Sequence, residues 1–384
     1  MSFLQKEIAK SKARGLHDQA GLPSKLLPHR VPSQKRDYEP ASWSKYFDER
    51  QPVSVNGNTF HVYSQGNEGP LLVLLHGGGY SALTWAQFTK CITSLVTCQV
   101  MAIDLRGHGS SVTTDDDDLS INTLATDVAG ILESVSNNRP IIAVGHSLGG
   151  AIAVRSTPLV SNIIGVIVID VVEGTAMDAL RSMQGFLRSR PSNFVSMSKA
   201  IEWCVRSGQI RNLQSAKVSV PGQIKNVVTG VLGVDDIDSE PKGDSSSDAC
   251  SEPLPAPMGT IVEGELSSTS EPQEHSPVKA DRYTWRINLA KTEKYWTEWF
   301  HGLSSAFLEI PVPKMLLLAG VDRLDKELTV GQMQGKFQLQ VLTACGHAVQ
   351  EDAPEKVAEA VATFLVRNKF TEAKTDFTWA VPCL

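Results

Sequence analysis

The feature that most restricts the fold of this chain is a series of short, continuously apolar runs that end in glycines or an aspartate. In the first half of the chain these runs lie at 71–79, 99–104, 140–144 and 165–169. None of them alternates apolar with polar residues, which indicates strands buried on both faces, as in a parallel sheet.

Stretches with apolar residues at helical spacing separate these runs. The predicted helices lie at 86–96, 119–135, 149–157 and 354–370, and two further strands lie at 314–318 and 337–342. Asn56 and Gly57 predict a tight hairpin before the first of these strands, because both can adopt positive φ. The alternation of strand and helix implies right-handed crossovers and an open, doubly wound, mostly parallel sheet.

This alternation stops between 171 and 310, where the sequence favours helices, including an aromatic-rich helical segment at 283–307. We expect this part to form a helical cap over the edge of the sheet where such folds bind ligands. The predicted organisation is a disordered basic arm at 1–40, core at 41–170, cap at 171–310, core at 311–370 and a C-terminal tail at 371–384.

The net charge of −6 is concentrated in two segments of the chain. Residues 235–281 carry twelve acidic residues against two lysines and few large apolar side chains, which predicts a disordered acidic insert within the cap. Residues 1–40 carry eight Lys or Arg against four acids. The rest of the chain is neutral, so we expect no nucleic-acid partner.

The chain contains no apolar run near the roughly 18 residues needed to span a membrane, and its N-terminus lacks the pattern of a secretory signal. We therefore expect an intracellular protein, cytoplasmic or nuclear, without a membrane partner. The six cysteines are scattered without the paired spacing of a zinc or redox site, and nothing in the sequence indicates a metal or cofactor.

The sequence GHSLGG places Ser147 where an apolar strand, IIAV, meets a helix start rich in small residues. The pentapeptide G-x-S-x-G is common by chance, but this strand–turn–helix context is typical of a nucleophile elbow, which presents a serine hydroxyl on a sharp turn. A serine needs a base to become nucleophilic, and in this chain order the base is a later histidine. His275 falls in the acidic insert and His301 in the aromatic segment, which leaves His347 in the loop before the last helix.

The carboxylate that would orient His347 is ambiguous from residue chemistry alone. Asp170 ends an apolar strand, whereas Asp322 and Asp325 follow the next strand, which is the more usual position in such folds. The carboxylate that does not orient the histidine is expected to cap a helix.

Backbone N–H donors for an oxyanion are expected from Gly78, in the HGGG sequence after the first buried strand, and from Leu148, which follows the serine. No G-K-[ST] sequence follows these glycines, which argues against a nucleotide site. Together these motifs predict the α/β-hydrolase fold with a helical cap and a disordered acidic loop, and a serine ester hydrolase.

Several further segments resemble the protein phosphatase methylesterase family from about residue 38 to 370, except in the acidic insert. They are IDVVEGTAMDAL, IEWCVRSGQIRN, YTWRINLAKTEKYW, LLLAGVDRLDK, GQMQGKFQ and CGHAVQEDAP. The resemblance implies a triad of Ser147, Asp170 and His347, and thereby favours Asp170 as the acid. It also implies removal of the methyl ester from the C-terminal leucine of the phosphatase 2A catalytic subunit, without a cofactor.

Two other classes stay open at this point: a general carboxylesterase for small esters, and a binding module on an inactive hydrolase fold. An epoxide hydrolase or dehalogenase would need an aspartate in place of Ser147. Within the acidic insert, 258–263 resembles a short motif that docks on phosphatase 2A regulatory subunits, with Met258 and Ile261 as apolar anchors and Glu263 as the acid. The alternative is a chance match in a solvated linker.

Overall fold

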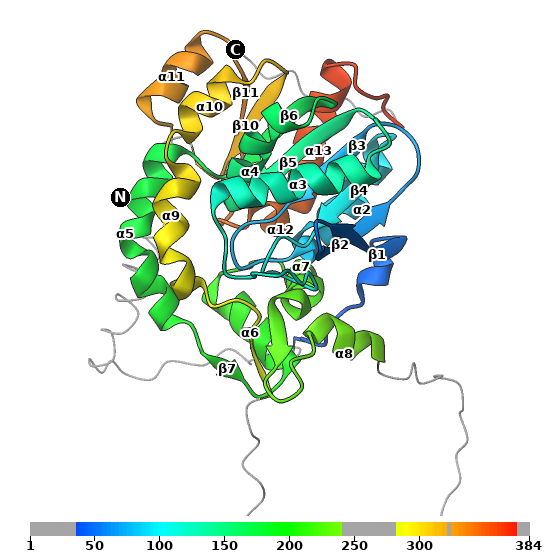
Figure 1. The fold of residues 1–384 in the computed structure, drawn as a ribbon, viewed down its shortest axis with the longest axis vertical. Coiled ribbons are helices and arrows are strands. Elements are labelled where there is room, and N and C mark those ends of the chain that lie inside the picture. The colour runs from blue at the N-terminus through cyan, green and yellow to red at the C-terminus, as the bar shows by residue number, and fades with distance from the viewer. Residues whose placement is uncertain (1–35, 240–281, 321–323, 375–384) are drawn as a thin grey trace, which may run out of the picture.

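The computed structural model describes residues 36–239, 282–320 and 324–374. Its centre is an eight-stranded sheet in the order β1-β2-β4-β3-β5-β6-β10-β11 (Figure 1). The strands are β1 Glu49–Val55, β2 Asn58–Gln65, β3 Leu71–Leu75, β4 Gln99–Ile103, β5 Ile141–His146, β6 Ile163–Ile169, β10 Lys314–Leu318 and β11 Gln338–Val341. The strands from β4 to β11 are parallel, while β1 and β2 pair antiparallel at one end. The predicted doubly wound, mostly parallel sheet is confirmed.

The continuous apolar runs arise because the inner strands lie between two hydrophobic cores. In β3, Leu71 and Val73 pack into one core, whereas Leu72 and Leu74 pack into the other. The predicted hairpin is also confirmed: Asn56 and Gly57 both have positive φ, and β1 and β2 flank them.

Helices cover both faces of the sheet (Figure 1). Residues of α3 (Ile121–Val135) and α4 (Leu148–Ser156) belong to the first core, and residues of α2 (Ala86–Leu95) and α13 (Pro354–Arg367) to the second. These four helices occupy the predicted positions within a few residues. Among the described residues, no helix is both long enough and apolar enough to cross a membrane.

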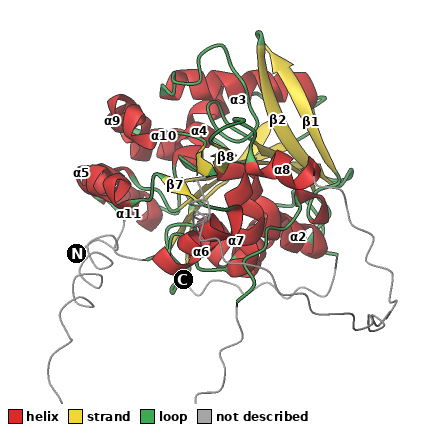
Figure 2. Ribbon diagram, turned by 90° about the horizontal axis from the view of Figure 1, so that it is seen from below, coloured by secondary structure: helices red, strands yellow, loops and turns green. Residues whose placement is uncertain are grey.

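The cap departs from the prediction, because it is not entirely helical. It contains a three-stranded sheet in the order β7-β9-β8, whose strands are β7 Asn193–Phe194, β8 Ile224–Asn226 and β9 Tyr283–Trp285. The segment predicted as an aromatic helix therefore begins as a strand, since Tyr283 joins the small cap core. The cap helices are α5 Glu173–Ser189, α6 Met197–Ser207, α7 Leu213–Ser219, α8 Gly233–Ser239, α9 Glu293–Phe300 and α10 Leu303–Glu309. In the view from below, α6, α7 and β7 face the reader (Figure 2).

Order extends slightly beyond the predicted limits. Helix α8 includes 235–239, which we had assigned to the acidic insert, because Asp235 pairs with Arg50 and Asp238 accepts a hydrogen bond from Trp43. Near the start of the described chain, Tyr38 packs against the cap core. The remainder of the insert, including 258–263, lies outside the described residues, as do most of the basic arm, most of the C-terminal tail and Asp322.

Beside the last helix, a buried carboxyl joins cap and core. Glu351, in the short helix α12 (Val349–Asp352), accepts hydrogen bonds from the hydroxyls of Thr84 in the core (2.5 Å) and Ser219 in α7 (2.6 Å). Its backbone carbonyl accepts another from Ser215. Burial raises the pKa of Glu351 to about 8. The carboxyl is therefore protonated at neutral pH, four residues after His347.

The turn between β5 and α4 yields the first prediction, which compares two glycines. A Cβ on Gly149 would lie 2.2 Å from the carbonyl oxygen of Leu75, whereas a Cβ on Gly185, in exposed helix α5, would meet no atom within 4 Å. We expect Gly149→Ala to lower the free energy of unfolding by about 3 kcal/mol or more. Gly185→Ala should raise it by up to about 1 kcal/mol through helix propensity. Urea unfolding measures both, and wild-type stability of Gly149→Ala would contradict this account.

A second prediction concerns Glu351 and pH. Its pKa is raised from 4.5 to about 8 in the folded state, so folding must hold a proton that the unfolded chain loses. The wild type should therefore lose stability relative to Glu351→Gln as pH rises from about 4.5 to 8, and the two should converge at lower pH. Urea unfolding between pH 5 and 8 tests this, with the exposed Glu355→Gln as control. A difference that does not change with pH would refute the buried, protonated carboxyl.

Candidate active site

Three loops at the carboxyl ends of strands β5, β6 and β11 bring together the three residues predicted as a triad. The Nε2 atom of His347 lies 3.1 Å from the hydroxyl oxygen of Ser147, and its Nδ1 atom lies 2.8 Å from Oδ2 of Asp170. These residues are 23 and 177 positions apart along the chain. The sheet aligns them because parallel strands end at one common edge, next to the point where the chain turns from one side of β3 to the other.

Ser147 sits on a strained turn. Its φ of 53° and ψ of −119° are unusual for a residue with a side chain, and its N–H donates to the carbonyl of Ile169. The turn is possible because Gly145 and Gly149 lack side chains: a Cβ on Gly145 would lie 2.1 Å from the carbonyl oxygen of Gly149. The serine hydroxyl is thereby directed towards His347.

Of the candidate acids Asp170, Asp322 and Asp325, the structure describes the first and the last, and only Asp170 lies beside His347. The side chain of Asp170 is fully buried, and in addition to contacting His347 it accepts a hydrogen bond from the N–H of Ala319 at 3.0 Å. Asp325 instead caps helix α11 (Lys326–Met333), accepting from the N–H of Leu328. The shielded carboxylate next to His347 is therefore Asp170, and Asp325 is the helix cap.

Two backbone N–H groups lie near Ser147, one in the loop after β3 and one at the first residue of α4. Those of Gly78 and Leu148 make no hydrogen bond with any other described residue. The neighbouring N–H of Gly79 is already used, since it donates to Nε2 of His108 at 2.9 Å. His76 fixes the start of the loop by donating through Nδ1 to the carbonyl of Gly77. The two free donors are thus the pair predicted for an oxyanion.

His146 supports the loop that carries His347, a role that the sequence analysis did not predict. Its Nε2–H donates to the backbone carbonyl of His347 at 2.8 Å, and the two rings lie 4.8 Å apart. Burial lowers the pKa of His146 to about 3, so this ring is neutral and holds the loop that carries His347 without adding charge. Its place between glycine and serine carries no signal, because that position of the motif accepts many residue types.

The loop that carries His347 is held from the other side as well. Asp352 accepts hydrogen bonds from the N–H groups of Gly346 (2.6 Å) and Arg211 (2.8 Å), and the Arg211 guanidinium donates to the carbonyl of Ala344. Arg211 belongs to the cap, between α6 and α7. Cap residues therefore help to place the imidazole.

Apolar cap side chains lie beside Gly78. Leu289, in the short 3₁₀ helix Leu289–Thr292, and Trp299, in α9, are the cap residues nearest to Gly78. The indole of Trp299 is fixed by donating to the carbonyl of Leu119 at 2.7 Å. An apolar group bound beside Ser147 would contact this wall.

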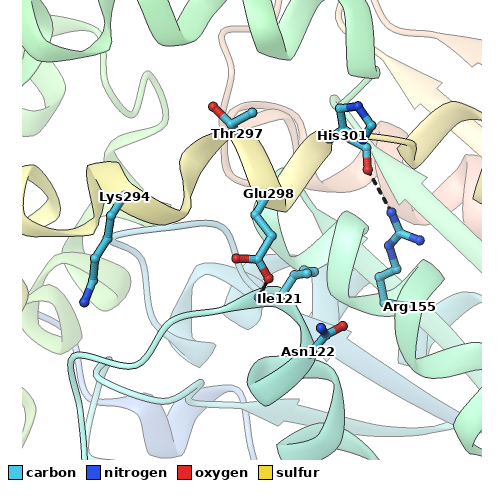
Figure 3. A pocket seen from close by; sticks show the side chains of 7 residues that line it. All are labelled: Ile121, Asn122, Arg155, Lys294, Thr297, Glu298 and His301. Carbon is cyan, nitrogen blue, oxygen red and sulfur yellow. Dashed lines mark hydrogen bonds between the residues drawn. The ribbon is translucent and has the colours of Figure 1, made fainter.

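A separate surface pocket lies between α3, α4 and α9, and it contains none of the three residues aligned above (Figure 3). Glu298 points from α9 to the N–H of Ile121, and Arg155 donates to the carbonyl of His301. Within the ranges that the structure describes, no cluster of His, Cys, Asp or Glu is arranged to hold a metal ion.

Comparison with known proteins identifies the family to which this chain belongs. The profile described as "Alpha/beta hydrolase family" matches residues 72–360. Proteins named protein phosphatase methylesterase 1 are 52% identical in Bos taurus (89% of this chain, 90% of the relative) and 51% identical in Homo sapiens (91% of each). The relative of that name in Neurospora crassa is 38% identical, covering 87% of this chain and 72% of its own length.

Solved structures show the same fold at low sequence identity. E-2-(acetamidomethylene)succinate hydrolase superposes with a TM-score of 0.59 at 17% identity, over 83% of this chain and 99% of its own. A marine microorganism esterase gives a TM-score of 0.53 at 18% identity, over 81% of this chain and all of the other. With a family profile over most of the sheet and relatives more than half identical across the chain, this protein is a hydrolase that belongs to the protein phosphatase methylesterase family of α/β-hydrolases.

Proposed function

We propose that this protein removes the methyl ester from the C-terminal leucine of the protein phosphatase 2A catalytic subunit, releasing methanol. The observation that carries the proposal is the aligned chain of Ser147, His347 and Asp170 beside two unused N–H donors. The substrate comes from the family: relatives that are half identical over nine-tenths of the chain are named protein phosphatase methylesterase 1.

In the proposed mechanism the Ser147 oxygen attacks the ester carbonyl carbon while Nε2 of His347 takes the hydroxyl proton. The carbonyl oxygen becomes an oxyanion that receives hydrogen bonds from the N–H groups of Gly78 and Leu148. When the carbon–oxygen bond to the methoxy group breaks, His347 returns the proton and methanol leaves. Water then attacks the acyl-enzyme with His347 as base, which frees the leucine carboxylate and restores Ser147.

Asp170 supports both steps without giving up a proton. Its carboxylate accepts a hydrogen bond from Nδ1–H of His347, which leaves the lone pair of Nε2 facing Ser147. Because the carboxylate is buried, its charge stabilises the imidazolium more strongly than an exposed carboxylate would.

The proposal extends to partners and location. The phosphatase 2A catalytic subunit is the substrate, and 258–263 is a candidate docking segment for its regulatory subunits on the basis of sequence alone. Action on this phosphatase would place the protein in the cytoplasm, the nucleus or both.

The direct test is methanol release from methylated phosphatase 2A, compared with turnover of small esters such as p-nitrophenyl acetate. The proposed function requires the methylated phosphatase to be hydrolysed with the higher kcat/KM. A general carboxylesterase would favour the small esters, and that result would replace the proposed substrate.

The triad predicts the effects of two single variants and their combination. Ser147→Ala should lose roughly 10³- to 10⁶-fold in kcat, His347→Ala should lose a similar factor, and the double variant should lose little more, because the two residues act as one unit. Initial rates with the methylated phosphatase measure the losses, and circular dichroism checks that the variants fold. Near-wild-type hydrolysis by Ser147→Ala would rule out the mechanism.

The acid is tested with a matched pair of aspartates. Asp170→Asn should lower kcat by roughly 10⁴-fold by stabilising the wrong tautomer of His347. Asp325→Asn should change kcat far less, because asparagine also caps helices well. If Asp325→Asn were the more damaging variant, Asp170 would not be the catalytic acid.

A further inference from the structure

Arg190 is a cation of the cap that stacks on an aromatic ring. It ends helix α5, and its Cζ atom lies 3.7 Å from the centroid of the Trp285 ring. Its side chain makes no hydrogen bond or ion pair with any other described residue, and its Nε is buried without a partner. The terminal nitrogens are not among the buried unpaired atoms, so they reach solvent.

The surface on which the guanidinium stacks is rigid. The indole N–H of Trp285 donates to the carbonyl of Pro191 at 2.8 Å, and its ring packs edge-on against Phe194 (5.3 Å) and Trp203 (5.8 Å). Stacking on one face fixes the plane of the guanidinium and leaves its edge of N–H donors open.

Stacking on Trp285 offsets some of the free energy that shielding this cation from water costs, but no described residue supplies a hydrogen-bond acceptor or a carboxylate for the guanidinium. Burial lowers the pKa of Arg190, although a guanidinium stays charged at neutral pH. The ionisable groups that act on Arg190 are the Cys204 thiol and the Tyr80 hydroxyl, and neither is charged at neutral pH because burial raises the pKa of both. The fold makes no use of the guanidinium N–H groups, whereas a bound anionic ligand would pair with them, and this favours a binding role for Arg190.

The ring that carries this cation lies near the loop after β3: Trp285 pairs with Ile224 in the cap sheet, and a Cβ on Gly222, two residues before Ile224, would lie 2.4 Å from the hydroxyl oxygen of Ser81. The electrostatic influence of Arg190 reaches Tyr80, where it opposes the rise in pKa that burial causes. Tyr80 follows Gly78 and Gly79 in the loop after β3, and its ring lies edge-on to His146, 5.6 Å away, next to Ser147. The Tyr80 hydroxyl also makes no hydrogen bond with a described residue and is not among the buried unpaired atoms.

We propose that Arg190, stacked on Trp285, forms together with the Tyr80 hydroxyl a subsite for an acidic group on the substrate segment that precedes the methyl ester. The guanidinium fork would pair with two oxygens of a carboxylate or a phosphate, and the Tyr80 hydroxyl would donate to a third acceptor position. This subsite deepens the proposed function and rests on it, because it requires a peptide ester at Ser147.

The test uses hexapeptides that end in leucine methyl ester. In each peptide set, one position before leucine is varied and carries glutamate, phosphoserine or glutamine. The readout at that position is the KM of the glutamine peptide divided by the KM of the acidic peptide. In the wild type this ratio should be roughly 10 to 100 at one position, as expected for a charge-assisted hydrogen bond. A larger ratio for glutamate assigns a carboxylate, and a larger ratio for phosphoserine assigns a phosphate.

Arg190→Gln should bring this ratio close to one, mainly through a higher KM for the acidic peptide. Arg190→Lys should fall between, because it keeps the charge without the fork. Arg188→Gln is the matched control: Arg188 is exposed, lies two residues earlier on α5, and should keep the wild-type ratio. Thermal unfolding checks that the variants are folded. If Arg190→Gln does not fold, the ratio measured with Arg190→Lys decides the test.

Two failures can be told apart. A wild-type ratio near one, or equal ratios in Arg190→Gln and Arg188→Gln, would overturn the subsite and leave the methylesterase intact. If the wild type hydrolysed p-nitrophenyl acetate but neither the methylated phosphatase nor any peptide ester, the proposed function would fall, and the subsite with it.

Discussion

The close approach of backbone at the turn from β5 to α4 is the constraint on which the rest of the structure depends. Ser147 can adopt its strained conformation only because Gly145 and Gly149 let the helix approach the neighbouring strands to within contact of their carbonyl oxygens. The same packing leaves the N–H of Leu148 without a helical partner beside the hydroxyl. Strain at this turn is therefore what exposes the serine, and the hydrophobic cores on both faces of the sheet maintain it.

The imidazole of His347 depends instead on hydrogen bonds that come from several parts of the chain. His146 donates a hydrogen bond to the backbone carbonyl of His347, and Asp170 pairs with its ring. Asp352 accepts hydrogen bonds from the N–H groups of the preceding residue, Gly346, and of Arg211 in the cap. Through these bonds, and through Glu351, a movement of the cap would be transmitted to the loop of the base. The position of the His347 imidazole therefore depends on the position of the cap.

In the proposed function, the sheet supplies the reacting residues and the cap supplies the surroundings that would select a substrate. Leu289 and Trp299 present apolar surface beside Gly78, and the proposed subsite adds the positive charge of Arg190 stacked on Trp285. An apolar terminal residue with an acidic group upstream would satisfy both features. Solved structures below 20% identity share the fold with this chain. A shared fold does not fix the substrate, so variants that test substrate choice belong in the cap.

The sequence by itself determined the parallel sheet, the serine turn and the choice of His347, because these depend on local patterns: continuous apolar runs, glycines around Ser147, and chain order. Local patterns could not place β9 in a small cap sheet, since three-residue strands form only where partners such as Phe194 lie nearby. They also left Asp170 undistinguished from Asp322 and Asp325 on residue chemistry, and only the family resemblance favoured Asp170. Only the tertiary structure separated Asp170 from Asp325 and revealed the roles of His146 and Arg190, because a side chain's partner is set by contacts between segments far apart in the chain.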